Sequence, residues 1–392
     1  MWRAPQLAET SSAEAPPLAL VVLGGVGEPH ARDARLRESL ASRLTRSPDA
    51  PLLLLGDVFQ GAGLLGFCPS ETKQRRSTPD CVHPGSSEAQ FDAILGPYAR
   101  SFPTHPVLAV AGAADHAGDP AATANACARI HAAGAGWRYF AQGCELDAEH
   151  PVARLDAGAL ALVALDSQAM LVDEEFRARS LAALHAELAA LRQARPDAWV
   201  ILALYHPLET YGKRNGSEWP DALRKDLPLA WPLQWLIGYE AQHTFEWRVR
   251  GLRRDLYAAL EASPVDAVVS AQDESLQLVE LDHPGARWQI VSGSAARKTR
   301  VKRLGLDWLW TNRLARALGL RDFAPSVGHE LLFAAGRADD EAARSGYGYA
   351  VLAASPQTLR VEFWDLAVNA PLGVAELVRP GDAPQRGQRE DQ

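Results

Sequence analysis

The chain has 392 residues, of which 47% are hydrophobic and 22% are charged. This composition is typical of a globular protein with a large buried core. The formal net charge of −8 argues against a surface that binds nucleic-acid phosphates. No apolar run reaches the length of about eighteen residues that a bilayer-spanning helix needs, so we expect no transmembrane segment.

The N-terminus and the cysteines bear on the compartment. Residues 1–17 lack the apolar middle of a secretory signal. We therefore expect a cytoplasmic chain, or an exported or periplasmic one if a leader was removed or the start is misassigned. The absence of a Cys-x-x-Cys pair argues against a zinc knuckle. Cys68 and Cys81 bracket a loop rich in Pro and Ser, which a disulfide would suit. The alternative is that all four cysteines, Cys68, Cys81, Cys127 and Cys144, are unpaired thiols.

Strand and helix patterns alternate along most of the chain. A helix is predicted over 31–46, where Leu36, Leu40 and Leu44 repeat every four residues. A second is predicted over 174–195 and is stopped by Pro196. Apolar runs predict buried strands at 18–23, 51–55, 107–111, 159–165, 199–204 and 265–270. This alternation indicates a stacked α/β architecture. Further runs at 288–292, 347–353 and 359–364 have no helices between them and predict an antiparallel flank.

We predict a flexible N-terminus (1–17), a single domain (18–371) and a disordered polar tail (372–392). Insertions are predicted at about 213–254 and 304–323. They carry Trp219, Trp231, Trp235 and Trp247 in the first and Trp308 and Trp310 in the second. One interpretation is that the insertions form a lid over the cleft and bury their own tryptophans. The other is that they present an aromatic face to a membrane surface or another protein. A basic cluster between the flank and the second insertion is a solvated loop or a site for an anionic ligand, a lipid headgroup or a partner; it comprises Arg297, Lys298, Arg300, Lys302 and Arg303.

Reactive groups of open α/β sheets lie in the loops after the carboxyl ends of strands. Five such loops read G-G-V-G (24–27), G-D-V (56–58), G-A-A-D-H (112–116), L-Y-H-P (204–207) and A-Q-D-E-S-L-Q (271–277). In order and spacing they resemble the calcineurin-like metallophosphoesterases, especially the tartrate-resistant (purple) acid phosphatase type and its bacterial relatives. The family motifs are G-D-x-G, G-D-N, G-N-H-D, G-H-[HY]-P and G-H-D-H-N-L-Q. The resemblance covers about Leu18 to Asp365. It implies an α/β fold, a four-layer αββα sandwich with mixed sheets flanked by helices.

The family's functional residues carry over only in part. Asp57 matches the metal-bridging aspartate and Asp115 the aspartate that orients the general-acid histidine, followed here by His116. Tyr205 stands at a ligand position, with His206 in the neighbouring non-ligating slot. The remaining ligand and acid positions are substituted: Gly25 for an aspartate, Ala113 for an asparagine, Ala114 for the general acid, and Gln272 and Glu274 for two histidines.

A two-metal phosphoesterase needs a bridging carboxylate and several imidazole or carboxylate ligands around the ion pair. Of the ligand set that the resemblance implies, Asp57 alone keeps its type. We therefore expect no bound metal or other cofactor and no ordinary two-metal phosphatase activity. On this interpretation Asp57 caps a helix or pairs with Arg297 or Lys298. The alternative is a single hard cation held by oxygens of Asp57, Glu274 and Asp115, with His116 nearby.

Three functions follow from these expectations. We favour a pseudoenzyme that binds an unknown protein or a small anionic ligand, with peripheral membrane contact left open and no nucleic-acid partner. The alternative is a divergent phosphoesterase that hydrolyses phosphate esters with one divalent metal or a rebuilt site; the third is a structural accessory subunit. Ser167 lacks a G-x-S-x-G context. The other histidines lack metal-ligand spacing and are expected to be surface or structural residues: His30, His83, His105, His131, His150, His185, His243, His283 and His329.

Overall fold

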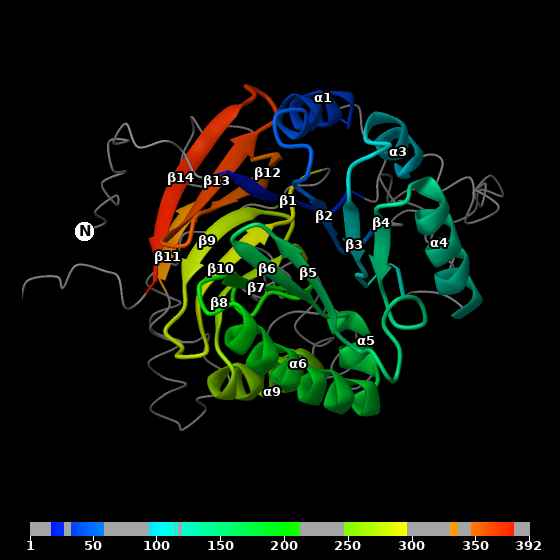
Figure 1. Cartoon of the computed structure of the whole chain (residues 1–392), viewed down its shortest axis with the longest axis vertical. Helices are drawn as coiled ribbons and strands as arrows, with labels where there is room; N and C mark the ends of the chain where they lie inside the picture. Colours follow the sequence, from blue (N-terminus) through cyan, green and yellow to red (C-terminus); the bar gives the residue numbers. More distant parts are fainter. Residues whose placement is uncertain are drawn as a thin grey trace, which may run out of the picture.

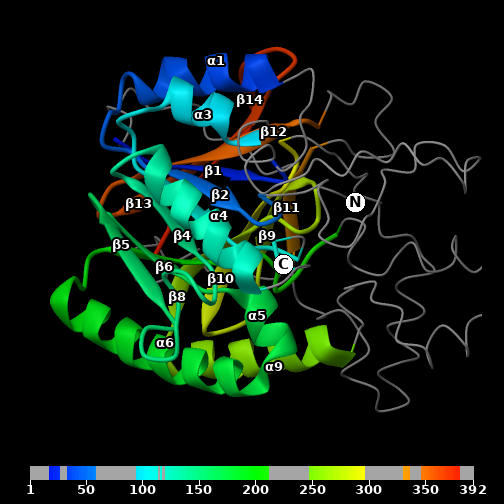
Figure 2. The same ribbon diagram turned by 90° about the vertical axis from the view of Figure 1, so that its right-hand side faces the viewer.

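The computed structural model describes residues 17–26, 33–58, 94–113, 115–116, 120–211, 247–295, 330–335 and 346–379. These residues form two seven-stranded sheets that pack face to face, with helices on both outer sides (Figures 1 and 2). The layers are helix, sheet, sheet and helix. The predicted α/β four-layer sandwich is confirmed.

The first sheet has the strand order β14-β13-β12-β1-β2-β3-β4. Strands β1 to β4 run parallel, and β12 to β14 form the antiparallel flank that the sequence predicts. Their bounds are Leu18–Gly24 (β1), Leu52–Leu55 (β2), Val107–Val110 (β3), Trp137–Phe140 (β4), Gly348–Ala354 (β12), Thr358–Asp365 (β13) and Ala370–Val378 (β14). Three helices cover its outer face: Asp33–Leu44 (α1), Gly96–Ser101 (α3) and Pro120–Ala133 (α4) (Figure 2).

The second sheet has the order β11-β9-β10-β8-β7-β6-β5 and is also mixed. Its bounds are Ala153–Ala157 (β5), Leu160–Ala164 (β6), Trp199–Ala203 (β7), Val265–Ser270 (β8), Leu276–Glu280 (β9), Ala286–Ser292 (β10) and Glu330–Ala334 (β11). The helices Ser167–Val172 (α5), Glu174–Ala194 (α6) and Trp247–Ala262 (α9) lie on its outer side (Figure 1). None of the helices in the described ranges is long and apolar enough to cross a membrane.

The continuous apolar runs of the central strands follow from burial on both faces. In β2, Leu53 and Leu55 join the core between the sheets, while Leu52 and Leu54 join the core beneath the first layer of helices. The spacing of α1 has the same cause, because its leucines at 36, 40 and 44 are all buried against that sheet. The alternate residues of β2 that face the helices and the regularly spaced leucines of α1 therefore pack in the same helix–sheet interface.

One predicted boundary is wrong. The tail is not disordered from residue 372, because 370–378 forms β14 and pairs with β13 as far as Val378. Residues 247–254 of the first predicted insertion belong to α9, which buries Leu252, Leu256 and Leu260. Residues 380–392 lie outside the described part of the chain.

The prediction of four unpaired thiols is also wrong, because Cys127 of α4 forms a disulfide with Cys144, in the loop after β4. Cys68 and Cys81 lie outside the described residues. The same holds for residues 1–16, for 213–246 and 304–323 of the insertions, and for the basic cluster 297–303. The competing interpretations of the tryptophans and of the basic cluster therefore stay predictions.

Candidate functional site

The strand-end loops of the two sheets meet. The loop after β1 reaches the loop after β10, because a Cβ placed on Gly25 would lie 2.9 Å from the carbonyl oxygen of Gly293. The backbone N–H of Gln272, after β8, donates to the carbonyl of Tyr205, after β7, at 3.1 Å. Gly25 has φ +66°, a conformation that favours glycine. An aspartate at this position would carry both a backbone strain and a steric conflict.

Asp57 and Tyr205 connect the two sheets directly. The Tyr205 hydroxyl donates to Oδ2 of Asp57 at 2.5 Å, and both side chains are buried. The tyrosine ring lies against Gly56, where an added Cβ would come within 1.9 Å of Cδ2. The sequence placed Tyr205 only at a ligand position and did not predict this contact. The predicted partners Arg297 and Lys298 lie outside the described residues.

Asp115 organises the loops of the first sheet. Its Oδ2 accepts the backbone N–H of Gly112 at 2.7 Å and that of Val58 at 3.2 Å. The side chain is buried, so these two donors supply the polar contacts that burial requires. One carboxylate thus closes its own turn and fixes the loop that carries Asp57. Ala113, one residue after Gly112, is half-buried, and Ala114 lies outside the described residues.

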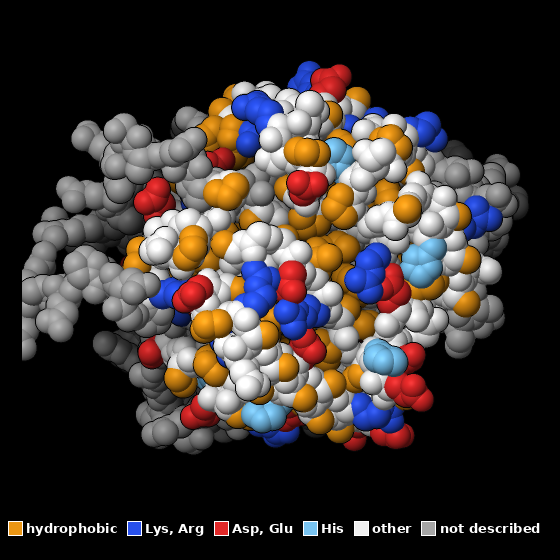
Figure 3. All heavy atoms as spheres, in the orientation of Figure 1, with side chains coloured by type: hydrophobic (Ala, Val, Ile, Leu, Met, Phe, Trp, Pro, Cys, Tyr) orange, Lys and Arg blue, Asp and Glu red, His pale blue; other side chains and the backbone are white. Residues whose placement is uncertain are grey.

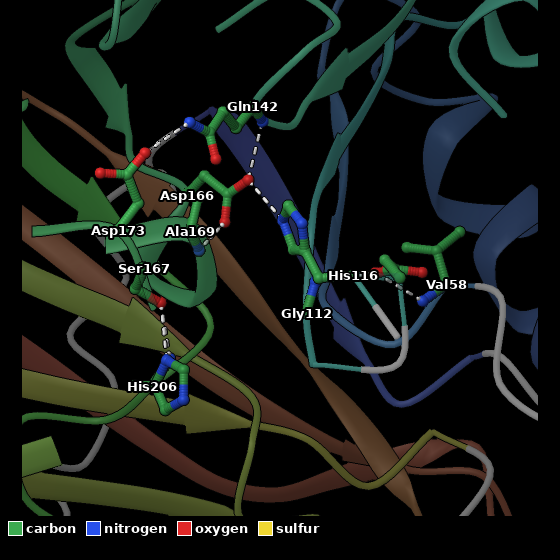
Figure 4. Close-up of polar contacts among 10 residues, drawn as sticks. Val58, Gly112, His116, Gln142, Asp166, Ser167, Ala169, Asp173 and His206 are labelled. Atoms are coloured by element: carbon green, nitrogen blue, oxygen red, sulfur yellow. Dashed lines mark hydrogen bonds and ion pairs between the residues drawn. The ribbon is translucent and has the colours of Figure 1, made fainter. Parts of the chain in front are cut away.

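His116 turns away from the Asp57 loop towards the second sheet. Its Nε2 lies 2.7 Å from Oδ2 of Asp166, which follows β6 (Figure 4). Asp166 is completely buried; it also accepts the N–H of Gln142 at 2.8 Å and caps α5 through the N–H of Ala169 at 2.9 Å. Asp166 is therefore a hub that the motif comparison missed, because it belongs to no family motif. The signal was an aspartate directly after a buried strand and before a short helical pattern.

The carboxylates influence two neighbouring titratable groups. Burial alone would lower the pKa of His116, but the charge of Asp166, its hydrogen bond and the charge of Asp115 together raise that pKa above its ordinary value. Burial raises the pKa of Tyr139 well above its usual range, and the charges of Asp115, Asp166 and Asp57 raise it further. The region is therefore electronegative and favours a protonated His116.

The His116 interaction predicts a pH dependence of stability. A raised pKa in the folded state means that folding takes up a proton, so the stabilisation is complete below the unfolded pKa of about 6.5 and is lost as pH rises through the folded value. We expect the free energy of unfolding to fall over this range, and the fall to be smaller in His116→Gln. Urea unfolding at several pH values from about 5.5 to 8.5 measures it. His150→Gln is the matched control, because its ring is 74% exposed. An unchanged slope in His116→Gln would contradict the prediction.

His206 and Ser167 form a second buried pair. Nδ1 of His206 lies 2.9 Å from Oγ of Ser167, which also accepts the His206 backbone N–H at 3.2 Å (Figure 4). The imidazole packs edge-on against the Tyr205 ring, with centroids 5.0 Å apart. Ser167 begins α5 and is completely buried. Its contacts with His206 therefore tie α5 to the loop after β7.

Buried polar side chains hold the last motif loop (271–277) in place. Gln272 and Asp273 are buried, and Glu274 takes a left-handed conformation with φ +44°. Oδ2 of Asp273 accepts the Thr210 hydroxyl and, at 3.0 Å, Nε2 of Gln277. The polar side chains of this loop therefore fasten it to the segment after β7.

The predicted site residues do not assemble into a metal-ligand cluster of the usual kind. Within the described ranges, Cys127, His131 and Cys144 are the only set of three His, Cys, Asp or Glu residues whose ligand atoms lie within 4.8 Å of one another. Asp57, Asp115 and Glu274 form no such set.

Comparison with known proteins identifies the fold. No protein-family model and no curated protein sequence matches the chain. Among solved structures, GAP50, described as the anchor in the inner membrane complex of Plasmodium, aligns over 93% of this chain and 89% of its own, with a TM-score of 0.51 and 12% identity. The purple acid phosphatase PPD1 of yellow lupin (Lupinus luteus) aligns over 93% of this chain, with a TM-score of 0.52 and 12% identity. This chain spans 54% of the length of the lupin structure.

The two mixed sheets, their helical layers and these likenesses define a metallophosphoesterase-type fold. Within that class the chain has the purple acid phosphatase-like architecture. The fold implied by the resemblance of the five strand-end loops is confirmed.

Proposed function

We propose that this protein is a catalytically degenerate metallophosphoesterase-like protein, a pseudoenzyme, with a binding or accessory role. The observation that carries the proposal is the hydrogen bond from the Tyr205 hydroxyl to Oδ2 of Asp57. The carboxylate that would bridge two metal ions in a phosphoesterase instead accepts a proton donor from the opposite sheet. Tyr205, which stands at a ligand position of the family motif, thus serves as the hydrogen-bond partner of Asp57.

The residues present do not fit a metal pair. Gly25 and Ala113 offer no side-chain donor atom. Asp115 directs Oδ2 to two backbone N–H groups, and Nε2 of His116 faces Asp166. Loss of second-shell partners alone typically weakens metal binding about 10–100-fold, and loss of direct ligands should weaken it further. We therefore assign no catalytic step to a bound metal.

An accessory role has a precedent in the fold. GAP50 shares the architecture and is described as an anchor. For the present chain we propose an unknown protein or a small anionic ligand as partner, bound through the former active-site cleft or the Trp-bearing insertions. Co-purification of a partner with the full chain, and its loss from a folded variant lacking 213–246, would support the insertions as the binding element. Retention of the same partner by that variant would exclude this segment.

The enzymatic alternative is a divergent phosphoesterase with a single metal or a rebuilt site. One experiment separates the two functions. The oxidised full chain is exposed to Fe³⁺, Zn²⁺ and Mn²⁺, desalted, and assayed for bound metal and for hydrolysis of 4-nitrophenyl phosphate. We expect substoichiometric metal and no metal-dependent turnover. A stoichiometric metal with metal-dependent hydrolysis would establish the alternative.

Asp57→Asn is the diagnostic variant for this experiment. The amide oxygen can still accept the Tyr205 hydroxyl, so the internal bond survives while the bridging charge is lost. A pseudoenzyme should show the same metal content and background rate with either residue. An active enzyme should lose both metal and turnover, because a metal site depends on that carboxylate.

A further inference from the structure

The disulfide on the outer edge of the first sheet lies beside a histidine. Cys127 and His131 are four residues apart on α4, and so share one face of that helix. Nδ1 of His131 lies 4.0 Å from Sγ of Cys127, and the ligand atoms of Cys127, His131 and Cys144 all lie within 4.8 Å of one another. Sequence reasoning passed over this set, because it searched for Cys-x-x-Cys pairs and treated His131 as a surface residue.

The histidine is oriented by a carboxylate. Nε2 of His131 lies 3.0 Å from Oε1 of Glu145, and Oε2 of Glu145 accepts Nε of Arg138 at 2.7 Å. The arrangement leaves Nδ1 facing the sulfurs while the other ring nitrogen donates to a carboxylate. Metal-bound histidines usually have this second-shell partner, which fixes the tautomer. Basic, acidic and histidine side chains lie together at the surface over α4 and β4 (Figure 3).

We propose that reduction of the Cys127–Cys144 disulfide creates a zinc site formed by the two thiolates and Nδ1 of His131, with water as fourth ligand. Tetrahedral Zn²⁺ accepts such a Cys₂His set, with Zn–S of about 2.3 Å and Zn–N of about 2.0–2.1 Å. The three ligand atoms would then be roughly 3.5–3.8 Å apart. The sulfurs must separate to that distance, while the imidazole needs only a small shift from its present 4.0 Å.

The chemistry balances with an external reductant. A trialkylphosphine breaks the S–S bond and is oxidised to its phosphine oxide, with water supplying the oxygen and the two thiol protons. A dithiol does the same by exchange, forming its own disulfide. Zinc then displaces both thiol protons to the buffer, so that two thiolates, a neutral imidazole and Zn²⁺ carry no net charge. The Glu145 charge is balanced by Arg138, whose guanidinium lies 2.5 Å from Oε2.

The location connects this site to the strand-end network. Cys144 lies two residues after Gln142, whose backbone N–H donates to Asp166. The disulfide joins that loop to the outer helix α4. Disulfide and zinc are thus alternative closures of the same loop, one in an oxidising and one in a reducing environment.

Cobalt titration tests the proposal on the full chain. A Cys68→Ser/Cys81→Ser background leaves Cys127 and Cys144 as the only thiols. After phosphine reduction in metal-free buffer, we expect one Co²⁺ per chain with thiolate-to-cobalt charge-transfer absorption, displaced by one Zn²⁺. The oxidised chain should give no such absorption, and neither should Cys127→Ser.

Single-residue variants distinguish a specific metal site from nonspecific metal binding by the thiolates. We expect His131→Ala to weaken Co²⁺ binding more than 10-fold and Glu145→Gln to weaken it by about 10-fold. His150→Ala is the matched control and should change nothing, because its ring is exposed and pairs with Asp147. Absence of the charge-transfer bands, unfolding of the chain on reduction, or equal affinity in His131→Ala and His150→Ala would each overturn the proposal.

Discussion

Replacing Asp166 with alanine is expected to lower the free energy of unfolding by about 3–7 kcal/mol. The carboxylate is completely buried and accepts donors from His116, Gln142 and Ala169. Loss of the α5 cap accounts for about 1 kcal/mol, and each buried donor left without an acceptor costs a further 1–3 kcal/mol. Urea unfolding monitored by far-UV circular dichroism measures the change in midpoint.

Asp173→Ala is the control for this prediction. Asp173 caps the neighbouring helix α6 through the N–H of Phe176 at 2.9 Å and is half-buried. Its removal should cost only about 1 kcal/mol, since water can replace the lost acceptor. Asp166→Asn should in addition reduce the pH dependence attributed to His116, because the negative charge is gone. Equal costs for Asp166→Ala and Asp173→Ala would refute the assignment of Asp166 as a hub.

Gly56→Ala is expected to destabilise the protein by about 2–5 kcal/mol. Gly56 has φ +64°, and an added Cβ would lie 1.9 Å from Cδ2 of Tyr205. The left-handed backbone accounts for about 1–2 kcal/mol, and displacement of the tyrosine ring for about 1–3 kcal/mol. The displacement also pulls the hydroxyl away from Asp57. Denaturant unfolding gives the loss of stability, and tyrosine absorbance reports the changed environment of the phenol.

Gly158→Ala separates the two contributions. Gly158 has φ +58°, and nothing lies within 4 Å of an added Cβ. It should therefore show the backbone cost alone, about 1–2 kcal/mol. The double variant Gly56→Ala/Tyr205→Ala should be destabilised by less than the sum of the two single-variant destabilisations, because removal of the ring relieves the clash. Additive costs, or equal costs for the two glycines, would show that the close approach of Tyr205 is unimportant.

The internal strand-end network occupies positions at which the metallophosphoesterase motifs that the chain resembles carry metal ligands. Where the first aspartate of the family would stand, Gly25 allows close approach of the opposite loop. Where a ligand histidine would stand, Tyr205 supplies a proton donor for the remaining carboxylate. A buried carboxylate needs a compensating partner whether or not a metal is present. The proposed loss of catalysis and the observed packing are therefore compatible in this chain.

Several elements could not be read from local pattern. The strand 370–378 contains Pro371 and Gly373, which are unfavourable in strands, and it lies at the edge of the first sheet, where proline is tolerated. Gly373 is required there by the ring of Phe333, which lies 2.5 Å from an added Cβ. Strand β4, in contrast, reads Trp-Arg-Tyr-Phe, an aromatic pattern of strong β propensity that the sequence reasoning overlooked.

The sequence by itself determined the layers and the places where polar residues gather. Doubly covered strands need continuous apolar runs and helices need four-residue spacing, and both are local properties of the chain. Only the tertiary structure decided which polar groups pair. Tyr205 and Asp57 are 148 positions apart, and His116 and Asp166 are 50 apart. Such contacts depend on which loops two packed sheets bring together. The Cys127–Cys144 disulfide is likewise a tertiary contact, between α4 and the loop after β4.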